Sequence, residues 1–187
     1  ASLLTGMFSM AGAEKWTYGD HLLNTGIAGI FASSYDSSKA TKAQVAAGKA
    51  AFRVYADTVD YMSSHAAGQS RGPEFITTAE GSYDKSVERF MNGSALFLKQ
   101  GNWVYGNYAG IDQTIADRTA FIPVKMNWTA DSLKNGRTPE KMNNSVSVFV
   151  PNYYAINGQT SEAMQVKSMK FLTWLNTSVT GKDYILN

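Results

Sequence analysis

A repeat of apolar residues at helical spacing, between positions 45 and 62, limits the fold of this chain more than any other feature. The residues that recur in steps of three and four are Val45, Gly48, Phe52, Tyr55, Val59 and Met62. This spacing places them along one side of an α-helix. A helix with one apolar side must bury that side against other elements. The 187 residues, of which 44% are hydrophobic and 17% charged, suffice for one domain with its own core.

Three further helices are predicted from apolar spacing and from capping residues. The expected helices are residues 16–34 with Asp20 as N-cap, residues 83–92 after Ser82 and ending at Asn92-Gly93, and a helix that begins after Thr160 or Ser161. A shorter helical segment is expected at 103–111, after a turn at Gly101-Asn102. No closing helix is expected at the C-terminus.

Short apolar runs between turn residues predict strands. The runs are Ala95 to Leu98, residues 119–124 (TAFIPV), residues 145–150 (SVSVFV) and residues 153–157 (YYAIN). The first two read as buried strands. Residues 125–144 are polar, contain Gly136 and Pro139, and predict a loop. The order of elements predicts a helix-rich α/β domain.

Composition excludes or disfavours several classes of protein. The net charge is only +2 and the basic residues are scattered, so nucleic acid is not an expected partner. The chain has no cysteine, which excludes disulfides and thiolate metal sites. No apolar run approaches the roughly 20 residues that cross a bilayer. The apolar N-terminal stretch lacks the positive region of a signal peptide.

The sequence contains no recognisable catalytic constellation. Neither His21 nor His65 has a second histidine or an acid at metal-ligand spacing, so no metal site is expected. Nucleophile-elbow and phosphate-loop motifs are absent. A glycosidase needs two carboxylates that flank the sugar, and the spacing of the acidic residues selects no such pair. We therefore expect a protein that is not an enzyme and that needs no cofactor.

The segment from Gly101 to Tyr105 (GNWVY) places aromatic residues in a turn that follows a predicted strand. A flat indole can stack on the apolar face of a sugar ring while neighbouring amides bind its hydroxyls. Trp103 beside Asn102 has this character, and Tyr105 adds a second aromatic ring. A core tryptophan that covers the end of a strand explains the same residues equally well.

Residues 86–108 (SVERFMNGSALFLKQGNWVYGNY) resemble the most recognisable segment of the bacterial extracellular solute-binding proteins of carbohydrate ABC transporters, the family of the maltose-binding protein. The family pattern is a helix that ends in F-x-x-G-x-A-A-M, a strand, and then G-x-W. The matching residues are Phe90, Asn92, Gly93, Ala95, Gly101 and Trp103. Leu96 and Phe97 depart from the pattern, because a small residue and methionine are usual there.

Later segments continue the resemblance. TAFIPVK looks like the family's strand that ends in proline, and SVSVFVPNYYAIN looks like its strand pair, with Ser145 and Ser147 in place of glycines. SEAMQVKSMKFLTWLNTSVTGKDYI resembles the family's A-x-x-F-l-x-W-L helix, through Ala163, Phe171 and Trp174. Together these matches cover most of residues 84–186.

The N-terminal part resembles the entry into the family's second lobe, which passes through an aromatic loop and a helix. In the maltose-binding protein an acid and an aromatic residue of that loop contact the sugar. The resemblance implies these roles for Glu14 and Trp16. Asp20 and His21, at the start of the same helix, are further candidates. A capping or solvated role is the alternative for both.

The resemblance implies a periplasmic-binding-protein-like (type II) fold with two lobes, in which residues 1–187 form the second, C-terminal lobe. The N-terminal lobe and the final helices are then absent from this chain. The implied function is to capture a sugar or oligosaccharide between the lobes and deliver it to the membrane permease subunits of an ABC importer. The implied protein is a monomer, extracellular or periplasmic, and a lipid-anchored lipoprotein when complete.

Two alternatives remain open at the level of sequence. A carbohydrate-active enzyme or an accessory carbohydrate-binding domain would use the same aromatic residues to line a substrate groove. A structural or interaction domain would bury Trp103. The richness in aromatic residues and the lack of clustered arginines favour a neutral saccharide as the ligand.

Overall fold

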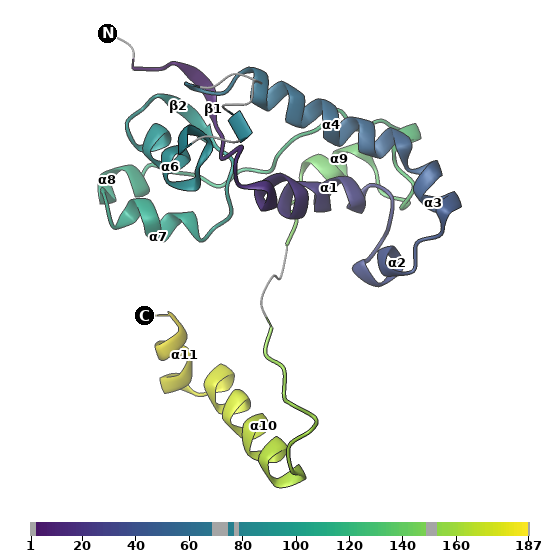
Figure 1. Cartoon of the computed structure of the whole chain (residues 1–187), viewed down its shortest axis with the longest axis vertical. Coiled ribbons are helices and arrows are strands. Elements are labelled where there is room, and N and C mark those ends of the chain that lie inside the picture. The colour runs from purple at the N-terminus through teal and green to yellow at the C-terminus, as the bar shows by residue number, and fades with distance from the viewer. Residues whose placement is uncertain (1–2, 69–74, 77–78, 149–152, 187) are drawn as a thin grey trace. The chain divides into compact units, whose positions relative to one another are not determined.

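The structure, a computed structural model, describes residues 3–68, 75–76, 79–148 and 153–186 (Figure 1). The chain divides into two compact units, residues 1–149 and residues 150–187. The elements of the first unit are β1 (Gly6–Ser9), η1 (Thr17–Leu22), α1 (Leu23–Ala28), α2 (Ser34–Ser38), α3 (Lys42–Ala47), α4 (Lys49–Ser64), η2 (Ala79–Gly81), α6 (Tyr83–Met91), β2 (Ala95–Leu98), α7 (Val104–Ala109), α8 (Gln113–Ala116), η3 (Ala130–Ser132) and α9 (Pro139–Asn143). The second unit contains α10 (Glu162–Thr177) and α11 (Val179–Leu186).

The first unit is a helix-rich α/β fold, as predicted, and a small parallel sheet lies within it. β1 pairs with β2 in parallel, so that Gly6 lies opposite Ala95 and Phe8 opposite Phe97. Phe8 also forms a parallel bridge with Ala66, just beyond α4. The connection from β1 to β2 carries the helices η1 through α6, which is the kind of crossover that parallel strands require. Both strands therefore end at the same edge of the sheet.

The core of the first unit lies between α1, α4 and the segment that follows α8 (Figure 1). Its buried apolar residues are Met10, Leu22, Ile30, Ala51, Met62, Ala66, Phe75, Met126, Trp128, Leu133 and Met142. The last four belong to residues 125–144, which the sequence predicts to be a polar loop. That prediction is wrong, because this segment forms η3 and α9 and contributes a few widely spaced apolar side chains to the core.

Capping residues account for most of the helix boundaries. The hydroxyl of Ser82 accepts a hydrogen bond from the backbone of α6, and Ser161 does the same for α10, as predicted. Gly93 follows α6 with a φ of +78°, a conformation that favours glycine at a helix end. Asp20 as the N-cap of the first helix is wrong. It lies inside η1, and Trp16 occupies the cap position without a side-chain hydrogen bond.

Two further helix predictions need correction. The predicted helix over 45–62 is divided at Gly48, which ends α3 and precedes α4. Its first part begins with a capping box, in which the side chains of Thr41 and Gln44 bond each other's backbone N–H groups. The expectation that no helix closes the chain is also wrong, because α11 follows α10 and packs against it. The helix predicted after Gly101-Asn102 is present as α7.

Of the predicted strands, only the run from Ala95 to Leu98 forms one. β2 is not fully buried, since Leu96 and Phe97 are exposed. Residues 119–124 form no strand, and Ile122 is 62% exposed. Residues 145–148 and 153–157 also lie outside strands, while positions 149 and 150 of the predicted run fall outside the described residues. These runs have strand-like composition but pair with no other strand in the described chain.

Candidate functional site

Four aromatic rings from three separate segments gather into one cluster. The ring centres of Trp16 and Trp103 are 5.8 Å apart, and that of His21 lies 5.0 Å from Trp103 and 5.3 Å from Trp16. Tyr83 also stacks on Trp16, with ring centres 6.2 Å apart and an interplanar angle of 30°. We call Trp16, His21, Tyr83 and Trp103 the aromatic cluster. Sequence reasoning predicted three of its four members as ligand-binding residues.

The topology of the sheet brings these rings together. Trp16 follows β1, and His21 lies in η1, the π-helical turn that begins directly after Trp16. Trp103 follows β2 and immediately precedes α7. Because β1 and β2 are parallel, the segments that leave their carboxyl ends emerge at the same edge. In α/β proteins the carboxyl edge of parallel strands is the usual position of a ligand site.

Trp103 is held on the surface of the unit and does not enter the core. Its side chain is 41% exposed, so the alternative of a buried core tryptophan is wrong. The indole folds back over Gly101, where an added Cβ would lie 2.0 Å from the ring carbon Cζ3 and 2.1 Å from Cη2. Only glycine leaves room for the ring in this position. The G-x-W spacing therefore has a local packing reason.

Glu14 is the predicted acidic residue that the structure places beside the cluster. Its Oε2 atom accepts a hydrogen bond from Nε1 of Trp16 at 2.9 Å, and the residue is half-buried. This bond fixes the orientation of the indole and keeps one carboxylate oxygen at its edge. A carboxylate beside an exposed aromatic face is able to accept hydrogen bonds from ligand hydroxyls.

The other predicted residues lie around the cluster and do not belong to its ring contacts. Asp20 and Asn102 are exposed, and Asp20 acts on His21 through its charge. The hydroxyl of Tyr105 accepts a hydrogen bond from Nε2 of Gln113 in α8 at 3.3 Å. The structure thus brings Glu14 together with the predicted rings. Asp20, Asn102 and Tyr105 are exposed and have no ring contact with the cluster among those described above.

Tyr83 was missed by the sequence reasoning. It is the first residue of α6, after the capping Ser82, and nothing in its local sequence marks it as a site residue. Burial is the largest cause that raises the pKa of its hydroxyl. A hydrogen bond with Trp103 lowers this pKa, and the charge of Asp84 raises it further. The hydroxyl also donates to Oδ1 of Asn107 at 2.8 Å, which links the cluster to α7.

Lys99 is a second residue that sequence reasoning missed. It follows β2 directly, and its Nζ donates to the backbone oxygen of Thr17 in η1 at 2.5 Å. Nζ also lies 5.9 Å from the centre of the Tyr18 ring. Burial lowers the pKa of Lys99 to about 8. Lys99 lies between β2 and the G-x-W residues Gly101 and Trp103, and this position is the sequence signal that could have identified it.

The environment of His21 follows from these neighbours. Partial burial is the largest cause that lowers the pKa of His21, the positive charge of Lys99 lowers it further, and Asp20 opposes both. The lowered pKa favours the uncharged form of the imidazole at neutral pH. An uncharged ring packs against Trp103 without the cost of burying a charge.

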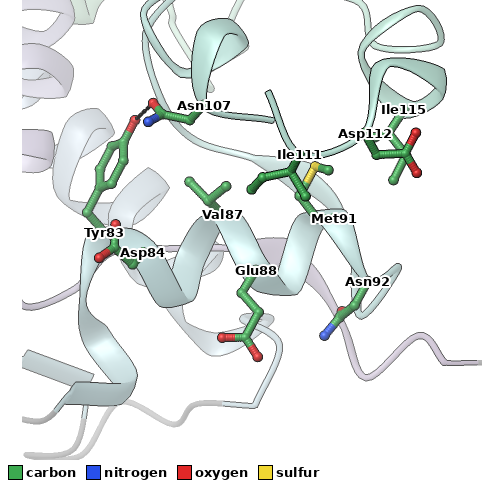
Figure 2. Close-up of a pocket in the computed structure, with 10 residues that line it drawn as sticks. All are labelled: Tyr83, Asp84, Val87, Glu88, Met91, Asn92, Asn107, Ile111, Asp112 and Ile115. Carbon is green, nitrogen blue, oxygen red and sulfur yellow. Dashed lines mark hydrogen bonds between the residues drawn. The ribbon is translucent and has the colours of Figure 1, made fainter. Parts of the chain in front are cut away.

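A separate pocket of about 460 Å³ lies next to the cluster, between α6 and the segment from α7 to α8 (Figure 2). Val87 and Met91 of α6 face Ile111 across it, and the bond from Tyr83 to Asn107 closes one end. None of the predicted site residues lines this pocket. Tyr83 is the residue that it shares with the aromatic cluster.

No group of three or more histidine, cysteine or acidic side chains is placed to hold a metal ion in the described part of the chain. Among the same residues, none of the helices combines the length and the apolar character needed to span a bilayer.

The aromatic cluster is therefore the candidate functional site. Its exposed indole is that of Trp103. The fixed carboxylate of Glu14 and the desolvated ammonium group of Lys99 lie beside the cluster, at the carboxyl edge of the parallel strands. Comparison of the chain with protein-family models, with curated proteins and with solved structures gave no match.

Proposed function

We propose that this chain is the second lobe of a solute-binding protein that captures a sugar or oligosaccharide for an ABC importer. The aromatic cluster is its half of the ligand site, and Trp103 lies against one face of a sugar ring. The carboxylates of Glu14 and Asp20 accept hydrogen bonds from the sugar hydroxyls, and the amide of Asn102 can accept or donate them. No covalent bond of the ligand is broken.

The observation that carries this proposal is the meeting of Trp16, His21 and Trp103 at one edge of the sheet with the Trp103 ring left 41% exposed. Aromatic rings normally gain free energy by burial, so a fixed and exposed indole within a ring cluster is suited to cover a ligand. The fixed carboxylate of Glu14 adds the polar group that such sites use for orientation.

The proposed mechanism is capture by closure. A complete receptor has two lobes around a hinge, and binding energy from both sides stabilises the closed form. The membrane permease then recognises the closed receptor. This lobe alone supplies half of the contacts, so we expect little or no measurable affinity of the isolated chain for sugars. The complete protein is proposed to be a monomer outside the cytoplasmic membrane, held there by a lipid anchor.

The test is a titration of the full-length protein with a panel of oligosaccharides, followed by tryptophan fluorescence and calorimetry. We expect saturable binding, which Trp103→Ala abolishes because stacking on the sugar face is lost. Trp174→Ala is the matched control, since Trp174 lies in α10 and is also exposed. Binding that survives Trp103→Ala, or no binding by any saccharide at millimolar concentration, would refute the proposal. Cleavage of a saccharide during the titration would favour a carbohydrate-active enzyme.

A further inference from the structure

Lys99 is a positive charge beside the aromatic cluster, and the described residues give it no carboxylate partner. Its Nζ donates to the backbone oxygen of Thr17, which is a neutral acceptor. None of the salt bridges among the described residues includes Lys99. An ammonium group has three N–H donors, and one hydrogen bond to a carbonyl leaves the other two for further acceptors.

The missing counter-charge is unusual because this ammonium group is desolvated. Lysine is rarely buried unless it is paired, since removal of its charge from water is costly. Burial alone accounts for its lowered pKa, and no nearby carboxylate offsets that effect. Neither Glu14 nor Asp20 forms a salt bridge with Lys99 in the described part of the chain.

Gln100, the next residue, also carries polar atoms whose hydrogen-bonding capacity is unsatisfied. Both its Nε2 and Oε1 atoms are buried, and neither has a hydrogen-bond partner among the described residues. A buried amide without partners is rare in folded proteins, because each unsatisfied group is destabilising. Two consecutive residues after β2 thus place polar groups with unused bonding capacity in the segment that leads to Trp103.

We infer that the ligand of the aromatic cluster carries a carboxylate, and that Lys99 is the residue that binds it. This inference rests on the proposed function and narrows the substrate class to acidic saccharides, such as uronic acids or oligosaccharides that contain them. The sugar ring lies on Trp103 while the carboxylate accepts a hydrogen bond from Nζ of Lys99.

The inference differs from the expectation of a neutral saccharide, which came from the richness in aromatic residues and the lack of clustered arginines. A single desolvated lysine is sufficient, because a charge pair is stronger in a partly buried site than in water. Partial burial and the charge of Lys99 lower the pKa of His21, which disfavours its charged form. Glu14 accepts one hydrogen bond from the Trp16 indole, and its carboxylate has further acceptor positions for ligand hydroxyl groups.

The experiment compares binding of galacturonate oligosaccharides and neutral galactose oligosaccharides of equal length to the full-length protein by calorimetry. We expect the acidic ligand to bind more tightly to the wild type. Lys99→Met should weaken that binding by about 10- to 100-fold, the usual contribution of a charge-assisted hydrogen bond. Binding of the neutral ligand should change little. Lys99→Arg, which keeps the charge, should retain part of the preference.

Lys134→Met is the matched control, because Lys134 also donates from Nζ to a backbone oxygen, that of Asp131, but lies away from the cluster. It should leave both affinities unchanged. Thermal unfolding of each variant shows whether Lys99→Met folds. Equal affinity of the wild type for both ligands, or an equal loss for both in Lys99→Met, would overturn the inference. If neither class of saccharide binds, the proposed function itself is refuted.

Discussion

Replacement of Gly101 by alanine tests directly whether local packing holds Trp103 in the aromatic cluster. In the structure, an added Cβ at position 101 would lie 2.0, 2.1 and 2.5 Å from three carbons of the Trp103 ring. Carbon atoms in contact prefer separations of about 3.5 Å, so the ring must move by about 1.5 Å. The conformation of Gly101 itself is not left-handed, and alanine adds no backbone strain.

The expected cost follows from the contacts that this movement breaks. Trp103 makes ring contacts with Trp16 and with His21. Each aromatic pair contributes about 0.5–1.5 kcal/mol beyond burial, so their loss lowers the free energy of unfolding by about 1–3 kcal/mol. The same movement separates the Trp103 indole from Trp16, whose ring is bonded to the carboxylate of Glu14, and sugar binding should weaken in parallel.

Urea denaturation and near-ultraviolet circular dichroism measure the two consequences. We expect a lower denaturation midpoint in Gly101→Ala and a reduced tryptophan signal in the folded state. Gly106→Ala is the control, because a Cβ there has no neighbour within 4 Å and the residue lies within α7. That change should stabilise the protein by up to about 1 kcal/mol through helix propensity. An unchanged spectrum and a stability loss below about 0.5 kcal/mol in Gly101→Ala would refute the packing argument.

Three other predictions concern stability. The pKa of Lys99 is about 8 in the folded protein and 10.5 in the unfolded chain. Between these pH values the unfolded chain binds more protons than the folded protein. The free energy of unfolding therefore rises with pH from about 8 to 10.5, by at most about 3 kcal/mol. Urea titrations at each pH should show that Lys99→Met removes this rise. Ser82→Ala removes the N-cap of α6 and should cost about 0.5–2 kcal/mol in the same assay, with rescue by aspartate. Arg89→Met breaks two 2.7 Å hydrogen bonds from a buried guanidinium to Glu80 and should lower the free energy of unfolding by about 1.5–3 kcal/mol. Arg53→Met removes an exposed ion pair on α4 and should lower it by less than about 0.5 kcal/mol.

Helices were predicted where a cap gives a local signal, whereas α9 and α11 were missed. The hydroxyl groups of Ser82 and Ser161 and the glycine at position 93 mark helix ends within a few residues of the helices they bound. Asp20 failed as a cap because the chain enters η1 four residues earlier, with Trp16 at the N-cap position. Cap preference alone does not determine where a helix begins when tertiary contacts fix its first turn.

Strands were predicted poorly because a strand needs a partner elsewhere in the chain. Residues 119–124 have the composition of a buried strand but remain unpaired, with Phe121 exposed. β1, in contrast, is four residues long and contains a glycine, and its sequence gives no strand signal. Only its pairing with β2, about 90 positions later, makes it a strand.

The candidate site was predicted in part, and the resemblance to solute-binding proteins accounted for that part. It pointed to Glu14, Trp16 and Trp103, which the structure places together. Tyr83 and Lys99 were missed because their roles depend on the contact of α6 and η1 with the segment after β2. No local pattern encodes such contacts, since they join residues far apart in the chain.

The π-helical turn η1 determines the direction in which Trp16 points. A π-helical turn is equivalent to an α-helical turn into which one residue has been inserted. Deletion of one residue from Thr17–Leu22 would restore regular α-helical winding and rotate the residues before it by about 100° around the helix axis. Trp16 would then point to another side of the helix, away from Trp103. The alignment of the two indoles thus depends on the length of the chain at one point, and a single codon gained or lost there is enough to create or abolish it.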